Sequence, residues 1–288
     1  MMRTTEGNNN PLVMNSNVSQ PVAGTPFSVG QGFNALSFRH HAFQSGFDPL
    51  IMVDHYHMHA PTFGAHPHAG LSAVTLLFED SQGKFHNTDS LGNDFDMLPG
   101  DLYWLKSGAS AVHDERPREG GTAHGLQMFV NIPNAQKNDA PETMHVKASD
   151  MPVITKDSAR VRVVLGEYLH LQSAVSPSVP MTILDGKLLE SGRFGYHAKA
   201  QSNSWIYAVS GALTIHINGA EIALAKGESI TLEANEHTLD AEFLNAQGEP
   251  TQFAVVSATP LNETFVQQGP LVAANDKAMK EVIARLSK

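Results

Sequence analysis

Short apolar stretches alternate with turn-forming residues along most of this chain, and this rhythm limits the possible folds more than any other feature. The turn signals include Ser81-Gln82-Gly83, Leu91-Gly92-Asn93 and Pro99-Gly100-Asp101. Their spacing is roughly the 8–12 residues that separate turns in all-β sandwiches and barrels. Helical periodicity is missing from this region. The sequence therefore predicts an all-β fold.

The chain is also long enough, at 288 residues, for two domains of ordinary size. Between Pro133 and Pro152 a polar, proline-interrupted segment suits a connection, and a second β-rich block follows. We predict an N-terminal barrel over residues 26–145 and a C-terminal barrel over 146–270. Residues 1–25, rich in Asn, Ser and Pro, are expected to form a flexible N-terminal arm.

One amphipathic helix is expected, at the C-terminal end of the chain within residues 271–288. Four apolar residues recur there with helical spacing: Met279, Val282, Ile283 and Leu286. Asn275 or Asp276 is a suitable N-cap for this helix.

Composition excludes several classes of function. Lys and Arg total 19 against 29 Asp and Glu, and no segment gathers basic residues, so direct nucleic-acid binding is disfavoured. No apolar run approaches the roughly 20 residues of a membrane helix. The N-terminal sequence lacks the apolar core of a secretory signal, so a cytoplasmic location is expected. Cysteine is absent, so any metal must be held by His and carboxylate ligands.

Two short strings predict such a metal site. His66-Pro67-His68 and His113-Asp114-Glu115 each place two metal-type ligands at i and i+2. On a β-strand both side chains leave from the same face, so two neighbouring strands would bring three imidazoles and one carboxylate together. This donor set suits Fe(II), Mn(II), Co(II), Ni(II) or Zn(II), and a six-coordinate ion would keep two open positions. A redox-active ion there could hold an organic substrate and dioxygen.

Other histidines carry weaker signals. In Asp54-His55-Tyr56-His57-Met58-His59, the three imidazoles share a face if the segment is extended. We expect them to line a rim or to satisfy buried polar groups, and a supporting or transient metal role is the alternative. Four further histidines without a partner pattern are expected to be structural: His40, His41, His86 and His124.

The two β-rich blocks resemble each other in the order of their turns and strands, which indicates an internal duplication. At the places corresponding to the two ligand strings, the second block has His197-Ala198-Lys199 and His237-Thr238-Leu239. Each string has lost a donor, because lysine is cationic at neutral pH and leucine has no donor atom. The second barrel is predicted to be metal-free and structural.

With these residues identified, the chain resembles the pirin family, two-domain members of the cupin superfamily. The resemblance covers nearly the whole chain after the N-terminal arm. It is carried by Phe47-Asp48-Pro49, Val53-Asp54-His55, His66-Pro67-His68-Ala69-Gly70, Asp89-Ser90-Leu91-Gly92-Asn93, Pro99-Gly100-Asp101-Leu102-Tyr103-Trp104, Val112-His113-Asp114-Glu115-Arg116-Pro117, His124-Gly125-Leu126-Gln127-Met128-Phe129-Val130-Asn131-Ile132-Pro133 and Gly269-Pro270-Leu271-Val272.

The resemblance implies two cupin barrels face to face with a C-terminal helix, and iron in the N-terminal barrel. Matched residue by residue, the iron ligands would be His66, His68, His113 and Glu115. Fe(II) is the expected ion, with Mn, Co, Ni, Zn or Cu as other possible occupants.

The resemblance also implies a function. Several pirins are similar in activity to quercetinases, which open the flavonol ring at the 2,3-bond with O2 and release carbon monoxide. The substrate here would be a flavonol or a similar enediol-like molecule, and Glu115 would accept the proton of its 3-hydroxyl. Other pirins suggest a second hypothesis, an iron-dependent redox-sensing protein that modulates a transcription regulator or a metabolic enzyme. A purely structural double barrel is the third.

Two positions depart from the usual family pattern. Ala69 stands where the family has Arg or Lys, and Ser72 where it has Glu. Loss of the basic residue is expected to change the charge near the pocket mouth. If the strand after Gly70 stayed regular, four residues would share the face of His66 and His68 and line the barrel, whereas a bulge would turn them away: Ser72, Val74, Leu76 and Phe78.

Overall fold

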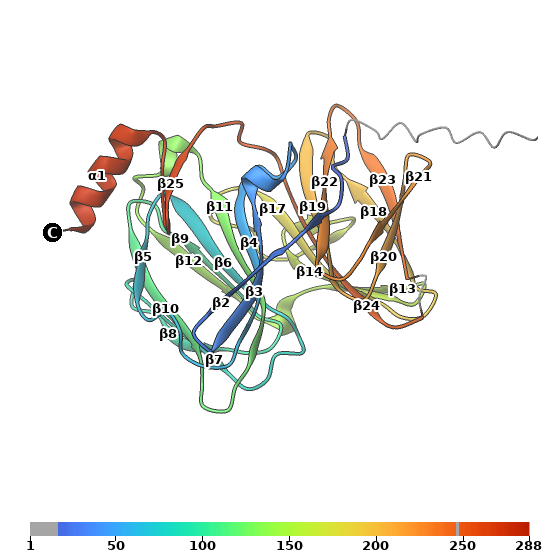
Figure 1. Cartoon of the computed structure of the whole chain (residues 1–288), viewed down its shortest axis with the longest axis horizontal. Helices are drawn as coiled ribbons and strands as arrows, with labels where there is room; N and C mark the ends of the chain where they lie inside the picture. Colours follow the sequence, from blue (N-terminus) through green and yellow to red (C-terminus); the bar gives the residue numbers. More distant parts are fainter. Residues whose placement is uncertain (1–16, 246–247, 288) are drawn as a thin grey trace, which may run out of the picture.

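The computed structural model describes residues 17–245 and 248–287, and within them β-strands dominate. Two barrels lie side by side, and helix α1 (Asp276–Leu286) stands at the far side of the first barrel (Figure 1). The prediction of an all-β fold with a C-terminal helix is confirmed. The side chain of Asn275 accepts a hydrogen bond from the backbone N–H of Ala278, so Asn275 is the N-cap.

The first barrel consists of a seven-stranded and a four-stranded antiparallel sheet, in the orders β12-β9-β6-β11-β4-β3-β2 and β5-β10-β7-β8. Its strands are β2 (Thr25–Val29), β3 (Phe33–Arg39), β4 (Leu50–Met58), β5 (His66–His68), β6 (Leu71–Leu77), β7 (Phe85–Asp89), β8 (Asp94–Met97), β9 (Leu102–Lys106), β10 (Ala111–Pro117), β11 (Ala123–Asn131) and β12 (Glu142–Val146).

The second barrel repeats this plan, with sheets in the orders β1-β22-β19-β24-β17-β14-β13 and β18-β23-β20-β21. Its strands are β1 (Val22–Ala23), β13 (Val153–Lys156), β14 (Ala159–Leu165), β17 (Met181–Leu188), β18 (Arg193–Ala198), β19 (Ser202–Ser210), β20 (Leu213–Ile217), β21 (Ala220–Leu224), β22 (Glu228–Ala234), β23 (Leu239–Leu244) and β24 (Thr251–Ala258). The matching strand orders support the duplication inferred from the sequence.

Smaller elements complete the description. Two short hairpins are formed by β15 (Glu167–Tyr168) with β16 (Leu171–Gln172), and by β25 (Val266–Gln268) with β26 (Leu271–Ala273). Three 3-10 turns are η1 (His40–Ala42), η2 (Asn134–Gln136) and η3 (Ala148–Asp150). In the described ranges, no helix is both long and apolar enough to cross a membrane.

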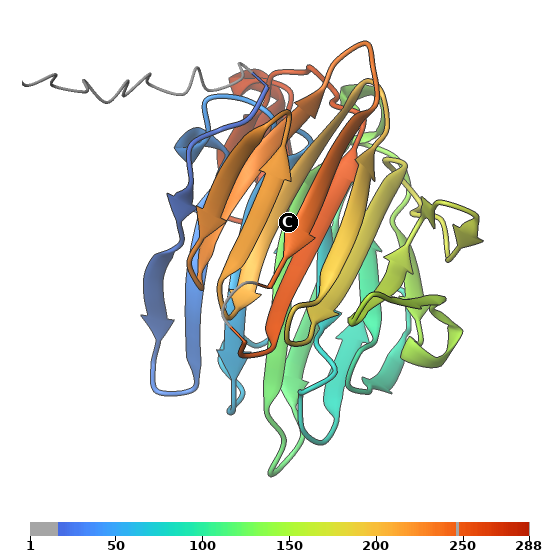
Figure 2. The ribbon, with the colours of Figure 1, turned by 90° about the vertical axis from the view of Figure 1, so that its right-hand side faces the viewer.

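The two seven-stranded sheets face each other and bury a shared apolar core. Strand β6 is buried along its whole length, since one face lines the first barrel and the other meets the second barrel. Phe38 illustrates the contact across the interface, with its ring 5.4 Å from Trp205 and 5.1 Å from Tyr207 between centroids. Figure 2 views the pair with the second barrel in front.

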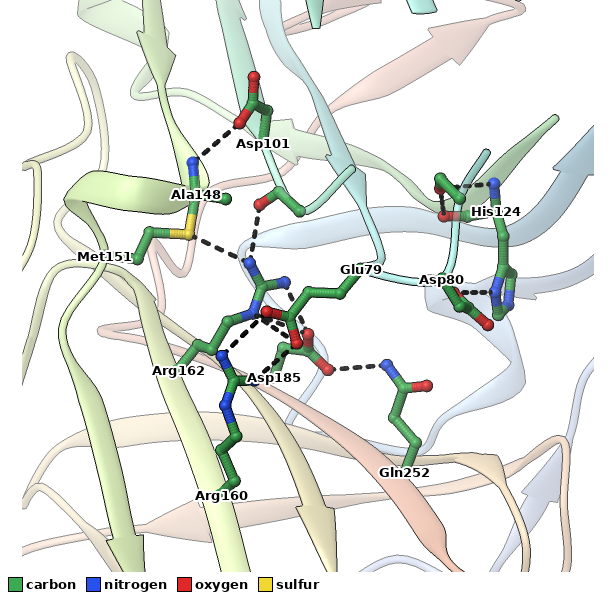
Figure 3. A network of polar contacts seen from close by, with 12 residues as sticks. Glu79, Asp80, Asp101, His124, Ala148, Met151, Arg160, Arg162, Asp185 and Gln252 are labelled. Atoms are coloured by element: carbon green, nitrogen blue, oxygen red, sulfur yellow. Dashed lines mark hydrogen bonds and ion pairs between the residues drawn. The ribbon is translucent and has the colours of Figure 1, made fainter. Parts of the chain in front are cut away.

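A buried polar network links the two barrels at one edge of this interface (Figure 3). Arg162 of the second barrel donates to Oδ2 of Asp185 through Nη2, at 2.6 Å, and through Nε, at 3.1 Å. It also donates to the carbonyl oxygen of Gly100 in the first barrel, at 2.9 Å. Gln252 completes the partners of Asp185, so the buried charges are paired.

Each end of the described chain packs on the barrel that is farther away in the sequence. Strand β1 pairs with β22, and Ser19 donates its N–H to Thr231, so the described part of the N-terminal segment lies on the second barrel. Residues 17–25 are therefore not the flexible arm that their composition suggested, because edge pairing needs only backbone groups. Residues 1–16 of that predicted arm lie outside the described residues. At the other end, Val272 donates to the carbonyl oxygen of Ala69 in the first barrel.

The polar segment expected to connect the barrels holds more structure than predicted. It contains β12, which pairs with β9 as the outer strand of the first barrel's large sheet. Outer strands need little apolar patterning, since only one side of the backbone is paired. The connection itself is accordingly shorter than the sequence indicated.

Candidate metal centre

The two predicted ligand strings lie on neighbouring antiparallel strands. In the register of β5 and β10, His113 is directly opposite His66, and Ala111 is opposite His68. The i, i+2 spacing sends His66 and His68 to the same side, where they meet His113 inside the first barrel. The structure thus brings three of the four predicted ligands into one group.

The three imidazoles are arranged as a metal site requires. Nε2 of His68 lies 3.1 Å from Nε2 of His66 and 3.0 Å from Nε2 of His113. Two nitrogens bound at about 2.1 Å and at a right angle would be roughly 3.0 Å apart. Three converging imidazole nitrogens therefore fit one face of an octahedral transition-metal site. Nδ1 of His66 also contacts the carbonyl oxygen of Gly64, at 2.9 Å, which orients its ring.

Two of these histidines, His68 and His113, are held in the form that binds metals. Burial, reinforced by the neighbouring His66, lowers the pKa of His113 to about 3. Burial also lowers the pKa of His68 well below its ordinary value, and the charges of His113 and His66 add to this. Both rings are therefore neutral at physiological pH, and neutral imidazole is the metal ligand.

Glu115 lies beside the histidines but is not part of the same close group. Its Oε2 accepts a hydrogen bond from Thr75 at 2.8 Å and lies 3.9 Å from Nδ1 of His113. Among the described residues, none donates a hydrogen bond to its Oε1. Burial raises the pKa of Glu115 to about 7, the Thr75 hydrogen bond opposes the rise, and the charge of Asp114 adds to it. Such a carboxylate can exchange a proton near neutral pH.

These residues lie at the wall of a cavity of about 370 Å³ inside the first barrel. Most of its lining is aromatic or sulfur-containing, which suits a flat organic molecule. Besides the four predicted residues, it is lined by Phe27, Phe33, Arg39, Met52, Asp54, Tyr56, Met58, Phe63, Phe85, Gln127, Phe129, Gln267, Gly269 and Pro270.

Most of this lining was not found from the sequence. The alternation of Met52, Asp54, Tyr56 and Met58 along β4 is a signal that could have identified it, since these residues share a face. Phe129 also faces the site, with its ring 5.2 Å from that of His68.

Of the two outcomes expected for Ser72, Val74, Leu76 and Phe78, the structure shows the one in which they turn away from the barrel interior. The last three belong to the core between the barrels, and Ser72 contacts Ser178 of the second barrel. The chain changes sheets between β5 and β6 at Gly70, whose φ of +71° is a conformation that favours glycine. This break reverses the alternation, so Thr75 rather than Val74 faces Glu115.

The two departures from the family pattern lie away from the cavity lining. Ala69 is fully buried, and its backbone forms a bridge with Leu271. Ser72 is likewise buried. Neither side chain lines the cavity, whereas Arg39 contributes a positive charge to its wall, 3.6 Å from Asp54.

The other histidines divide into two kinds. His59 is exposed, whereas His86 is buried and contacts Asp96 and Arg118. His55 and His57 instead meet His124 in a second group of three. The sequence shows no partner pattern for His124, which was expected to be structural, yet His124 lies directly opposite His57 on β11. A pattern within one strand cannot reveal a partner on another strand.

The second barrel places different residues at the corresponding strands. On β18 and β23 the inward positions are apolar: Phe194, Tyr196, Ala198, Leu239, Ala241 and Phe243. His197 points outward and contacts Asp240, at 2.7 Å. His197, which the sequence comparison matched to a metal ligand, therefore lies one residue away from the inward-facing positions of β18.

Known proteins share this architecture. Quercetin 2,3-dioxygenase from Acinetobacter baumannii superposes with a TM-score of 0.80 at 24% identity, covering 93% of this chain and 96% of that one. A bacterial pirin from Escherichia coli, solved in complex with nickel(II), gives a TM-score of 0.60 at 16% identity, covering 84% and 98%.

Sequence comparison is more specific than these structural likenesses. A family model described as Pirin matches residues 23–130. Mouse pirin is 30% identical over 245 residues, which cover 82% of this chain and 80% of the mouse protein. The chain therefore belongs to the pirin family.

Proposed function

We propose that this pirin is a mononuclear non-haem metal dioxygenase of the quercetin 2,3-dioxygenase type, acting on a flavonol or similar enediol-like substrate with O2. The observation that carries the proposal is the position of the imidazole group and Glu115 at the wall of an aromatic-lined cavity. The solved quercetin 2,3-dioxygenase that shares the fold supports the choice of substrate class.

Iron(II) is the proposed ion, with His66, His68, His113 and Glu115 as its ligands. When bound there, the metal would supply a Lewis acid and open positions for two reactants. The convergence of three imidazoles fits such an ion, and the structure of a related pirin with nickel(II) supports a site for divalent transition metals in this fold. Glu115 lies outside the close group of three imidazoles, and its carboxylate would turn toward the ion to complete the set.

The chain's own residues would position the substrate. Phe33, Tyr56 and Phe129 provide aromatic surfaces on the cavity wall, and stacking on them would hold a flat ring while excluding water. The ring of Phe33 already stacks on Tyr56 at 5.5 Å between centroids, so this part of the wall is preorganised. Preorganised walls lower the entropy lost when a substrate binds.

Glu115 would act as the base. Its carboxylate would take the proton of an acidic enol-type hydroxyl, and the Thr75 hydroxyl would hold Oε2 in place during the transfer. Oε1 remains available for the incoming proton, since no described residue donates to it. Glu115 is thus proposed to have two functions, as ligand and as proton acceptor.

An aerobic assay with the iron-loaded protein tests the proposal. Loss of quercetin with release of carbon monoxide is expected, and Glu115→Gln should lower kcat by about a hundredfold or more because it removes the base. The matched control is Glu119→Gln, on a loop of the same barrel. Absence of turnover under conditions where a known quercetinase is active would overturn the proposal. A redox-dependent protein partner and the cytoplasmic location stay predictions.

A further inference from the structure

A second group of histidines lies on strands β4 and β11 of the first barrel, outside the cavity described above. Strands β4 and β11 are antiparallel neighbours, with His57 directly opposite His124. His55 precedes His57 by two residues, so its side chain leaves from the same face. One nitrogen from each of the three rings can be chosen so that all lie within 4.8 Å of one another.

The contacts within this group are close. Nε2 of His55 lies 2.7 Å from Nε2 of His124. The ring of His57 stacks on that of His124, with centroids 4.1 Å apart and an interplanar angle of 8°, so the exposed His57 ring would rotate out of this stack to point a nitrogen at the same ion. Two Nε2 atoms this close must share a proton or a metal ion, and at about 2.1 Å from each nitrogen an ion would need only a small separation of the rings.

We propose that His55, His57 and His124 form a second metal site, which binds a divalent ion of the zinc, copper or nickel type. The donors are imidazole nitrogens without thiolate, which suits these ions and not Ca²⁺ or Mg²⁺. The pattern of two histidines on one strand and a third directly opposite is the same one that the first site uses.

The other ring nitrogens of two of these histidines are anchored. Nδ1 of His124 lies 2.8 Å from Oδ1 of Asp80 (Figure 3). Nδ1 of His55 lies 2.5 Å from the hydroxyl of Tyr207. In metal sites, ligating histidines almost always donate their second N–H to a carboxylate, a carbonyl or a similar acceptor, which fixes the ring and raises its basicity. Both anchors here are placed to accept such a bond.

Burial and charge also fit the proposal. His55 and His124 are buried, while His57 is exposed, so the group has one side open to solvent through which an ion can enter. Asp80 supplies a negative charge beside the group, and Lys226 of the second barrel supplies a positive charge that opposes it.

The location gives the site a structural consequence. Tyr207 lies on β19 of the second barrel, whereas the three histidines lie on β4 and β11 of the first. An ion held by His55 would fix the ring that contacts Tyr207, so binding would strengthen the contact between the barrels. The midpoint of thermal unfolding is therefore expected to rise with metal concentration.

The test uses the full chain with the first site removed by His66→Ala/His113→Ala, so its result does not depend on the proposed function. Titration with Zn²⁺ against a competing indicator should show one remaining equivalent. Adding His57→Ala, which alters an exposed residue and leaves the core intact, should lower the Zn²⁺ affinity of the remaining site at least tenfold. The matched control is His59→Ala, which alters an exposed histidine just after the end of β4 and should leave the Zn²⁺ affinity unchanged.

Two further measurements separate a metal site from a hydrogen-bonded histidine cluster. The electron paramagnetic resonance spectrum of the first-site variant with one equivalent of Cu²⁺ should show coupling to three nitrogens, and to fewer after His57→Ala. Tyr207→Phe should weaken Zn²⁺ binding about tenfold through loss of the anchor. Zn²⁺ affinity unchanged by both His57→Ala and Tyr207→Phe would overturn the proposal, as would a copper spectrum that His57→Ala leaves unaltered.

Discussion

The two barrels share one strand order but line their interiors with different kinds of residue. Inside the second barrel, Tyr196 stacks on Phe243 at 5.5 Å between centroids, and Phe243 meets Phe253 edge-on at 5.1 Å. Inside the first, three imidazoles and a carboxylate border a cavity of about 370 Å³. The same scaffold therefore holds either an apolar interior or a candidate metal site, and the inward residues of two short strands decide which.

The candidate site in the first barrel is also expected to lower the stability of that barrel. Buried histidines and Glu115 replace apolar side chains that would stabilise the barrel, and the cavity leaves wall atoms without packing partners. The second barrel and the shared core between the barrels offset this loss, because both are filled with apolar side chains. The apolar second barrel thus contributes stability to a molecule whose first barrel holds the candidate site.

The largest expected effect distinguishes the two barrels by metal binding. His113→Ala should weaken metal binding at the first site by more than about a thousandfold, since loss of a ligand exceeds the roughly 10–100-fold cost of losing a group that only orients one. His197→Ala, in the second barrel, is the control and should leave both affinity and stability unchanged, because its ring is half exposed. Elemental analysis and metal titration measure both. Equal effects of the two substitutions would contradict the assignment.

The second contrast concerns packing. Phe243→Ala should lower the free energy of unfolding by about 3–5 kcal/mol, because Phe243 is fully buried in a filled interior. Phe129→Ala in the first barrel should cost only about 1–2 kcal/mol, because Phe129 already borders a cavity. Urea denaturation measures both. Phe129→Ala should in addition raise the KM for a flavonol, whereas Phe243→Ala should not.

Much of this contrast could be predicted from the sequence. Turn spacing indicated the β fold, and the His66 and His113 strings indicated the first site, because i, i+2 spacing needs only local strand geometry. The N-cap at Asn275 was also predictable, since capping depends on neighbouring residues.

What could not be predicted depends on contacts distant in sequence. The reversed alternation after Gly70 follows from a change of sheet, and the partner of His57 lies on β11, which the pattern of β4 cannot show. The edge pairing of β1 with β22 joins backbone groups from opposite ends of the chain, and it leaves no signal in the side chains.

Acidification should reveal a third difference, in the metal-free protein. His55 and His113 have pKa values of about 3 through burial, whereas unfolded histidines titrate near 6.5. The unfolded chain therefore binds more protons between these values, and stability falls as the pH falls, by about 2 kcal/mol for each residue at pH 5. The raised pKa of Glu115 acts in the opposite direction from pH 7 to about 4.5 and offsets about one of these histidines.

A net loss of at least about 2 kcal/mol is thus expected between pH 7 and pH 5. The histidines of the second barrel are exposed, so the acid sensitivity should start in the first barrel. Amide hydrogen exchange at pH 5 should show earlier exchange in β10 than in β23, after correction for intrinsic rates. Simultaneous exchange in the two strands would argue against this origin, and added Zn²⁺ at pH 7 should protect β10 selectively.

The smallest expected effect tests how the exchanged chain ends hold the barrels. Helix α1 is attached to the first barrel through β26 and through Arg285, which donates to the carbonyl oxygen of Ala109 at 2.6 Å. Asn275→Ala removes the N-cap and should cost about 1 kcal/mol. Because Val272 is anchored in the core independently of the cap, the loss should appear as faster amide exchange within α1 alone. Faster exchange in β10 as well would show that the helix stabilises the strand that carries His113. The C-terminal segment would then stabilise the first barrel, as the pairing of β1 stabilises the second.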